Sequence, residues 1–222
     1  MPGHRVTLHR DVFDRADSNP ASGPYTSGSA YSGSGFADAQ IVGQKMRGTS
    51  TTTDNAMVLL APTQGNPIAR NQFITIVIGT KGAGSSEFVG ILRMAEPFSV
   101  TGYFFVAAAG ESTSSRITAI NAGTPSDLIT ENATTWLVGD ELGAEIETDP
   151  LGATTLRLYR NGRQLLAISD ATIVSGRLGW DIYNDTAVGN AEIAKITGGE
   201  LQASPLSFTR TRPAVWRPGR AK

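Results

Sequence analysis

The sequence predicts an all-β protein, built as a two-sheet antiparallel β-sandwich with extended terminal arms. Three observations lead to this fold class. About a dozen short runs rich in β-branched and aromatic residues follow one another at regular spacing. Turn-forming residues separate these runs, and no amphipathic pattern extends beyond one or two helical turns. Many short strands with no helices between them are typical of a sandwich or a barrel.

The stretch 140–180 carries this pattern most clearly, as a three-stranded antiparallel meander. Asp149-Pro150-Leu151-Gly152 has the composition of a turn between the first two runs of this stretch. Asn161-Gly162 separates the second run from the third, and it is a strong hairpin signal because both residues accept positive φ. The three runs span residues 142–148, 154–160 and 163–168.

The composition argues against several classes of protein. The chain has 222 residues and a net charge of -1, which argues against specific nucleic-acid binding by the whole surface. It has no cysteine, so disulfides and thiolate chemistry are excluded. No apolar run approaches the roughly 18 residues of a membrane span, and residues 1–15 lack the apolar segment of a secretory signal. We therefore expect neither membrane insertion nor such a signal.

The remaining strands are expected on both sides of the meander. Apolar residues on both faces of 71–78 predict a central strand. The Gly-rich residues 80–86 predict a hairpin loop, because they lack the spacing of a phosphate-binding loop. Residues 124–127 have the composition of a cap on a short helical turn. The other expected strands span 11–17, 39–47, 55–60, 87–94, 101–108, 116–120, 178–183 and 191–196.

Three segments lack the pattern of a packed strand. Residues 1–10 are polar and basic and predict an N-terminal arm or a loose terminus. Residues 18–35 are rich in Ser, Gly and Pro, and they form either a loop on the domain or a flexible linker. Residues 202–222 are basic and rich in proline and arginine. These boundaries leave one β-sandwich domain over residues 11–201.

The basic C-terminal segment, 202–222, predicts an arm that docks on a partner chain. It combines several arginines and prolines with two aromatic side chains that could serve as anchors. A solvated, disordered tail is the alternative interpretation of the same composition. The residues expected to make the docking contacts are Phe208, Arg210, Arg212, Trp216 and Arg217.

Four short motifs resemble one family. The opening Asp11-x-Phe13-x-Arg15-Ala16-Asp17 resembles the start of concanavalin A-like, laminin-G-like jelly-roll domains. The Asn161-Gly162 hairpin, the later Ser175-Gly176-Arg177-Leu178-Gly179 and the closing Gly198-Gly199-Glu200-Leu201 are similar to segments of the same domains. The resemblance covers about residues 11–201. It implies a jelly roll in which the first and last strands lie close together.

The same resemblance implies a setting, because such domains are frequent in tailed-phage virion proteins and in bacterial surface proteins. We therefore expect a structural protein of a phage virion, either a minor tail component or a head-decoration protein. The expected partners are other virion proteins, further copies of the chain in the particle and, where the particle meets its host, a cell-surface polysaccharide. The expected location is the surface of the particle.

One strand carries three acids that could suggest glycoside hydrolysis. Glu145, Glu147 and Asp149 alternate along one face, and some jelly-roll hydrolases place their two catalytic carboxylates on a single strand. The spacing departs from that motif, and Asp149 belongs to a turn, so we interpret the acids as a solvated strand face. The only histidines, His4 and His9, lie in the expected arm, which argues against a His-based catalytic triad. We expect no catalytic residues and no enzymatic activity.

A candidate glycan site lies near the end of the strand expected at 178–183. If the apolar residues of this strand face the core, Asp181 and Tyr183 face outward, beside Asn184. An exposed tyrosine next to acid and amide groups is a surface on which sugars stack, although single exposed aromatic residues are also common. Asp185 and Asn190 lie nearby and could add oxygen ligands for Ca²⁺. A polar turn is the simpler interpretation, so we expect no metal and no cofactor.

The sequence thus leaves three classes of function. The first is the non-enzymatic virion protein implied by the resemblance and by the expected arms. The second is a carbohydrate-binding module of a bacterial surface or secreted protein, which overlaps with the first if a virion protein contacts host glycan. The third is a glycoside hydrolase, which the acids on the 142–148 strand favour least.

Overall fold

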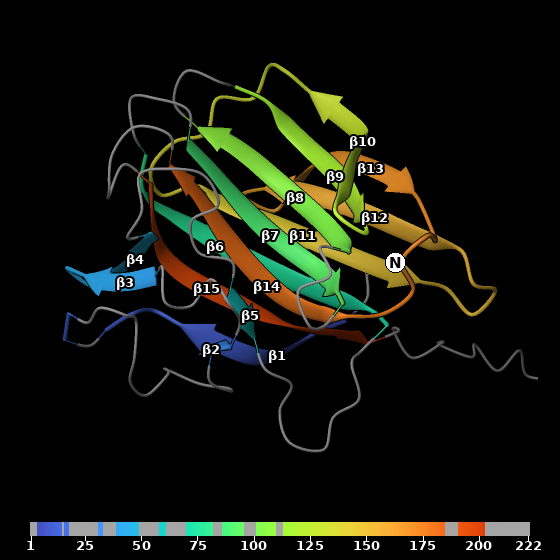
Figure 1. Ribbon diagram of the computed structural model, residues 1–222, viewed down its shortest axis with the longest axis horizontal. Coiled ribbons are helices and arrows are strands. Elements are labelled where there is room, and N and C mark those ends of the chain that lie inside the picture. The colour runs from blue at the N-terminus through green and yellow to red at the C-terminus, as the bar shows by residue number, and fades with distance from the viewer. Residues whose placement is uncertain are drawn as a thin grey trace, which may run out of the picture.

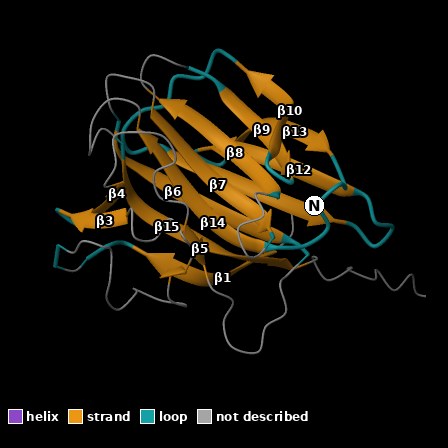
Figure 2. Cartoon of the chain, in the orientation of Figure 1, coloured by secondary structure: helices purple, strands orange, loops and turns teal. Residues whose placement is uncertain are grey.

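Two antiparallel β-sheets pack face to face in the computed structural model, as the sequence predicts (Figures 1 and 2). In the part of the chain that the structure describes, every regular element is a strand, and no helix is long and apolar enough to cross a membrane. The described residues are 4–14, 16–17, 31–32, 39–48, 58–60, 70–81, 86–95, 101–109, 113–184 and 191–202.

The first sheet, sheet A, contains the predicted meander. Its strand order is β13-β12-β11-β6-β15-β4-β3, and β1 also pairs with β15. The central position expected for the strand after residue 70 is confirmed, because β6 pairs with β11 on one side and β15 on the other. The strands are β1 (His4–Asp11), β3 (Ala39–Val42), β4 (Lys45–Gly48), β6 (Gln72–Thr80), β11 (Glu141–Thr148), β12 (Thr154–Arg160), β13 (Arg163–Ser169) and β15 (Glu192–Gln202).

The second sheet, sheet B, lies in front of sheet A in Figure 1. Its strand order is β10-β9-β8-β7-β14-β5-β2. The hairpins β7–β8, β8–β9 and β9–β10 make one half of it, and β14 comes from much later in the chain to pair with β7. The strands are β2 (Tyr31–Ser32), β5 (Val58–Leu60), β7 (Ser86–Met94), β8 (Gly102–Ala109), β9 (Ser115–Asn121), β10 (Thr124–Glu131) and β14 (Arg177–Asn184).

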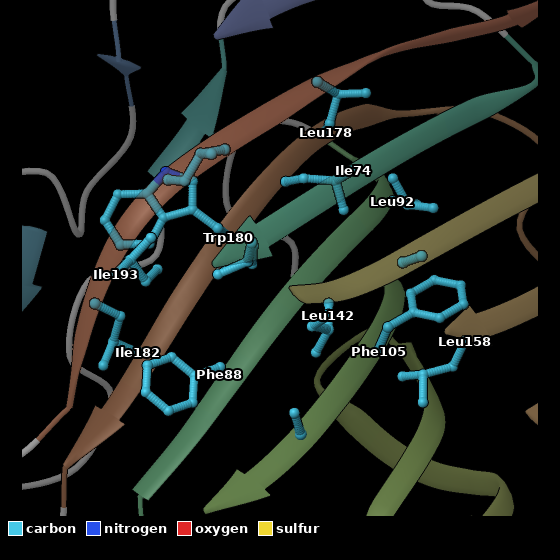
Figure 3. Packing of buried hydrophobic residues seen from close by; sticks show 14 of the residues in the cluster. Ile74, Phe88, Leu92, Phe105, Leu142, Leu158, Leu178, Trp180, Ile182 and Ile193 are labelled. Atoms are coloured by element: carbon cyan, nitrogen blue, oxygen red, sulfur yellow. The ribbon is translucent and has the colours of Figure 1, made fainter. Parts of the chain in front are cut away.

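The core fills the space between the inner faces of the two sheets (Figure 3). Strand alternation sends every second side chain inward, so each sheet supplies a layer of large apolar groups. At the centre the layers are close: a Cβ atom on Gly90 of β7 would lie 2.8 Å from Cγ2 of Ile74. Fully buried members include Ile74, Leu142, Leu158 and Ile193 of sheet A and Phe88, Leu92, Phe105, Trp180 and Ile182 of sheet B.

The first and last strands pair, as the resemblance implies, but the expected N-terminal arm is wrong. Residues 4–11 form β1, which is antiparallel to β15 with Asp11 opposite Ile196. The strand belongs to the sandwich because β15 presents a free edge beyond the short β4, and backbone pairing there needs no apolar period. The strand expected at 11–17 is therefore displaced toward the N-terminus.

The opening motif has a structural explanation. Phe13 leaves the end of β1 with a positive φ of 53° and enters the core, where none of it is exposed. Its backbone N–H donates to Oδ1 of Asp11 at 2.7 Å. Asp14 accepts from the side chain of Gln44 at 3.0 Å, and Asp17 accepts from the backbone N–H of Gly43 at 2.9 Å. The motif thus anchors the chain after β1 to the β3–β4 turn.

Three further expectations about connections were wrong. The single strand expected at 39–47 is the hairpin β3–β4, because Gly43 and Gln44 adopt positive φ values of 56° and 61° and turn the chain. The residues between β6 and β7 do not close a hairpin, because β6 lies in sheet A and β7 in sheet B. Residues 124–127 begin β10 rather than capping a helical turn, since Ala122 and Gly123 turn the chain back onto β9.

Candidate functional site

The expected glycan site lies on β14, and the structure gives it wider surroundings. Trp180 and Ile182 are fully buried in the core, so the intervening Asp181 and the following Tyr183 lie on the outer face of sheet B and are half-buried. Asn184 ends the strand, opposite Ser86 of β7 in the backbone register. The predicted outward direction of Asp181 and Tyr183 is confirmed.

Asp181 and Tyr183 line a groove on the outer face of sheet B. The groove has a volume of about 480 Å³ and crosses β14, β7, β8, β9 and β10. Its residues come from neighbouring strands in register: Asp181 is opposite Val89, Val89 is opposite Val106, and Val106 is opposite Arg116. Because directly opposed residues of antiparallel strands share a face, one row of side chains runs across the sheet.

The floor of the groove is apolar. Val89 of β7 and Phe104 and Val106 of β8 belong to a small apolar cluster that is separate from the main core. Each of the three is less than a tenth exposed, yet all three line the groove. Ile120 of β9 packs against this cluster. Sheet B therefore buries apolar side chains on both of its faces, which gives the outer groove an apolar, close-packed floor.

The walls of the groove are polar, and hydrogen bonds and ion pairs hold them in place. On one side, Nη2 of Arg116 lies 2.9 and 2.8 Å from the two carboxylate oxygens of Glu87. Because Arg116 is on β9 and Glu87 is on β7, this ion pair crosses over β8. Near the sheet edge, the hydroxyl of Thr118 donates to Oδ1 of Asp127 at 2.6 Å. Half of the Asp127 side chain stays open to solvent, with 55% exposed.

The groove residues contributed by β7 to β10 were missed by the sequence analysis. Phe104 and Val106 lie in a run that is apolar on both faces, which predicts a buried strand but not a ligand surface. The only available signal was the alternation of Arg116, Thr118 and Ile120 beside that run. The sequence could not reveal that β14 joins this face, because its pairing with β7 spans about 90 residues of chain.

The acids of β11 were expected to form a solvated strand face. This expectation is wrong at Glu145, because only 4% of this residue is exposed. Its carboxylate receives a hydrogen bond of 2.7 Å from the hydroxyl of Tyr159 and pairs with Arg5 at 2.9 Å. Glu147 pairs with Arg157 at 2.9 Å, and the Asp149 carboxylate accepts backbone N–H groups within its own turn. The three carboxylates thus serve three separate structural contacts.

The candidate calcium ligands lie partly, and the expected docking residues of the arm wholly, outside the described residues. Within the described ranges no group of three or more His, Cys, Asp or Glu side chains could hold a metal ion. Asp185 and Asn190, named with the calcium alternative, lie outside the described residues. So do the five residues expected in the docking arm, Phe208, Arg210, Arg212, Trp216 and Arg217.

Comparison with known proteins gives the fold its name. No protein-family model and no curated protein sequence matches the chain. Solved structures do match most of the chain in fold. The carbohydrate-binding module CBM66 from Bacillus subtilis is 13% identical with a TM-score of 0.50, over 79% of this chain and 92% of that one. The fold is the concanavalin A-like jelly-roll sandwich.

Two further structures agree on this jelly roll. The exoplasmic/lumenal domain of VIP36, in a Ca²⁺/Man-bound form, is 11% identical with a TM-score of 0.52, over 76% of this chain and 83% of that one. The carbohydrate recognition domain of Emp46p, in a metal-free form, is 10% identical with a TM-score of 0.51, over 72% and 84% of the two chains. At these identities the likeness establishes the architecture alone.

Proposed function

We propose that this jelly roll is a non-enzymatic carbohydrate-binding domain that takes a sugar in the sheet B groove. The observation that carries the proposal is the pairing of an apolar floor with polar walls in that groove. A sugar ring has C–H faces that pack on apolar and aromatic side chains, and its hydroxyls need both donors and acceptors. Val106 and Phe104 offer an apolar surface for the ring. Polar groups that can bond to the hydroxyls come from Asp127, Thr118 and Tyr183.

The preorganisation of the walls supports this function. Arg116 and Glu87 hold each other across β8, and Thr118 holds Asp127, so these groups are in place before a ligand arrives. A ligand then has few side chains to immobilise, which reduces the entropic cost of binding. The solved structures of similar fold include carbohydrate-binding domains by their own descriptions, which is consistent with the proposal.

The absence of enzymatic activity is part of the proposal. Retaining and inverting glycosidases need two carboxyl groups that flank one bond, with one of them available as an acid. Glu145 and Glu147 are instead paired with Arg5 and Arg157. In the sheet B groove, Glu87 is paired with Arg116. Each of these three carboxylates is therefore held in an ion pair with an arginine.

A place in a tailed-phage virion is the narrower proposal, and the sequence resemblance alone supports it. The opening motif that carries the resemblance has a structural role here, since Asp14 and Asp17 anchor the chain to the β3–β4 turn. The opening motif therefore indicates the jelly-roll fold more directly than a place in a virion. Detection of this chain in purified particles at a fixed copy number would support the narrower proposal, and its absence from them would refute it.

Binding measurements test the groove directly. The purified chain would be titrated with soluble glucans, mannans, fructans and their oligosaccharides by calorimetry and affinity electrophoresis. We expect Tyr183→Ala and Asp127→Ala to weaken binding by about tenfold or more, the equivalent of roughly 1.4 kcal/mol. Ser126→Ala is the matched control, because it is exposed on the same strand as Asp127 but points to the other face. Equal affinity in all four proteins would refute the site, and folded wild-type protein that binds none of the sugars would refute the function.

A further inference from the structure

The opposite face of the sandwich carries a second groove. It lies on the outer face of sheet A, has a volume of about 490 Å³, and runs along β12 from the β11–β12 turn. Thr155, Arg157 and Tyr159 alternate along β12 and all face it. The run from Ala153 to Tyr159 spans about 20 Å at the usual rise of a strand. Glu147, Asp149 and Gln164 complete its lining.

Tyr159 is held in a fixed orientation at one end of this groove. It lies opposite Gly143 of β11, and a Cβ atom on Gly143 would be 3.3 Å from Cβ of Tyr159, so the glycine leaves room for the ring. The Tyr159 hydroxyl donates to Oε2 of Glu145 at 2.7 Å. Burial and this hydrogen bond raise the pKa of the Tyr159 hydroxyl well above its usual value, which keeps the hydroxyl protonated.

A residue of β1 supports that arrangement. Arg5 pairs with Oε1 of Glu145 at 2.9 Å, whereas Tyr159 bonds to the other carboxylate oxygen, Oε2. The Arg5 guanidinium also lies 5.3 Å from the ring centroid of Phe73, a cation–π contact on β6. Contacts from β11, β1 and β6 thus form a chain from Phe73 through Arg5 and Glu145 to the Tyr159 hydroxyl.

The rest of the groove presents polar groups to solvent. Arg157 and Glu147 form an ion pair of 2.9 Å, and about a quarter of each side chain is exposed. Gln164, on the strand next to Tyr159 and opposite it in register, is exposed and carries both a donor and an acceptor. With its arginine already paired and two acids in its lining, this surface disfavours an anionic ligand.

We propose that this sheet A groove is a second carbohydrate-binding site, which takes a neutral oligosaccharide lying along β12 with a sugar ring against Tyr159. Its elongated shape suits an extended chain of sugars better than a compact small molecule. Arg5 acts as a positioning residue that contacts no ligand. Two sites on opposite faces make the domain bivalent, so it can join two glycan chains or bind a dense glycan surface with avidity. This inference is independent of the sheet B groove.

An NMR titration with neutral oligosaccharides separates the two sites. We expect the amide signals of Gly143, Gln164 and their neighbours to shift in wild-type protein, in addition to those around the sheet B groove. Tyr159→Ala should abolish the shifts on sheet A and leave those on sheet B. Arg163→Ala, an exposed change on β13 outside the groove, is the matched control and should change neither set.

Two more variants distinguish a binding role from a structural one. Tyr159→Phe keeps the ring but loses the bond to Glu145, and Arg5→Ala removes the support behind that carboxylate. Both should weaken sheet A binding at least severalfold while the affinity at sheet B and the folded spectrum stay unchanged. A mere loss of stability would lower the melting temperature without changing the affinity of the folded protein.

Each outcome of this titration decides between the proposals. Shifts confined to sheet B would overturn the second site and leave the proposed function standing. Shifts confined to sheet A would support the second site and overturn the sheet B groove. No shift on either face, with glucan, mannan and fructan oligosaccharides all tested, would overturn both.

Discussion

Gly176 lies against the backbone of Arg93, so closely that a Cβ atom at position 176 would be 2.1 Å from the Arg93 carbonyl carbon. The side chain of Gln72 ties the two segments together: it accepts from the backbone N–H of Arg93 at 2.8 Å and donates to the carbonyl of Gly176 at 2.6 Å. Gln72 belongs to sheet A and Arg93 to sheet B, so this contact joins the two sheets at one end of the sandwich.

The Arg93 side chain extends the same junction. It is 1% exposed, and its backbone holds a positive φ of 53°, which is unusual for a residue with a side chain. Its guanidinium donates to the carbonyl oxygens of Arg70 and Ile173 and to the hydroxyl of Thr148. These hydrogen bonds hold the buried Arg93 side chain in one place. They explain how the backbone of Arg93 keeps its strained, positive φ.

The first prediction concerns this glycine. Gly176→Ala should destabilise the fold by about 3 kcal/mol or more, because the new methyl group would overlap the backbone of Arg93 and Met94. Gly123→Ala is the control: its φ is +82° but nothing lies within 4 Å, so only backbone strain of about 1 kcal/mol is expected. Urea unfolding measures the free energy of unfolding of both variants. Equal losses of stability in the two variants would contradict a steric clash at position 176.

The second prediction separates two glutamates of β11. Glu145→Gln should cost about 1–2 kcal/mol, because a buried carboxylate loses its charge while Tyr159 and Arg5 still face it. Glu147→Gln should change the free energy of unfolding by less than about 0.5 kcal/mol, because its ion pair with Arg157 is partly solvated. Chemical denaturation measures the free energy of unfolding of the two single variants. A larger loss of stability in Glu147→Gln than in Glu145→Gln would contradict this prediction.

The third prediction concerns acid stability. Burial by itself raises the pKa of Asp140, but hydrogen bonds from Asn161, the Leu137 backbone and Arg160 outweigh it, so the pKa lies below its usual value. A carboxyl whose pKa is lower in the folded than in the unfolded protein stabilises the fold above the unfolded pKa. That contribution is lost as the pH falls through the folded pKa, here below about pH 4.

Asp140→Asn tests this linkage. We expect the variant to lose about 1–3 kcal/mol at pH 7, and to lose less additional stability than wild type between about pH 5 and pH 2. Asp127→Asn is the control, because 55% of that side chain is exposed. Unfolding free energies measured across this pH range would disprove the assignment if the Asp140→Asn and wild-type curves ran parallel.

The fourth prediction follows from the sequence alone and concerns residues 203–222, which make up all but the first residue of the basic C-terminal segment. Deleting this segment should leave the melting temperature of the sandwich nearly unchanged, because its composition offers no apolar period to pack on the domain. The deletion should abolish incorporation into an oligomer or particle, if Trp216 and Phe208 anchor the arm on a partner. A drop of several degrees, or normal assembly of the truncated chain, would contradict the docking role.

Local pattern was sufficient for much of the fold. The meander of β11, β12 and β13 was predicted within a residue or two at each end, because alternation and the Asn161-Gly162 turn act between neighbouring strands. The outward direction of Asp181 and Tyr183 followed by the same alternation from the apolar Trp180 and Ile182, which are buried. By contrast, β1 was missed as a strand, since its pairing with β15 depends on an edge formed by the other end of the chain.

The sequence by itself determined the all-β class, most strand positions and two of the residues in the sheet B groove. Only the tertiary structure decided which strands share a sheet, and therefore which outward side chains meet. The order β14-β7-β8-β9 places Asp181 in one row with Arg116, and β1 places Arg5 beside Glu145. The physical reason is that alternation sets the face on which a side chain lies, whereas its neighbours on that face depend on pairing between segments distant in the chain.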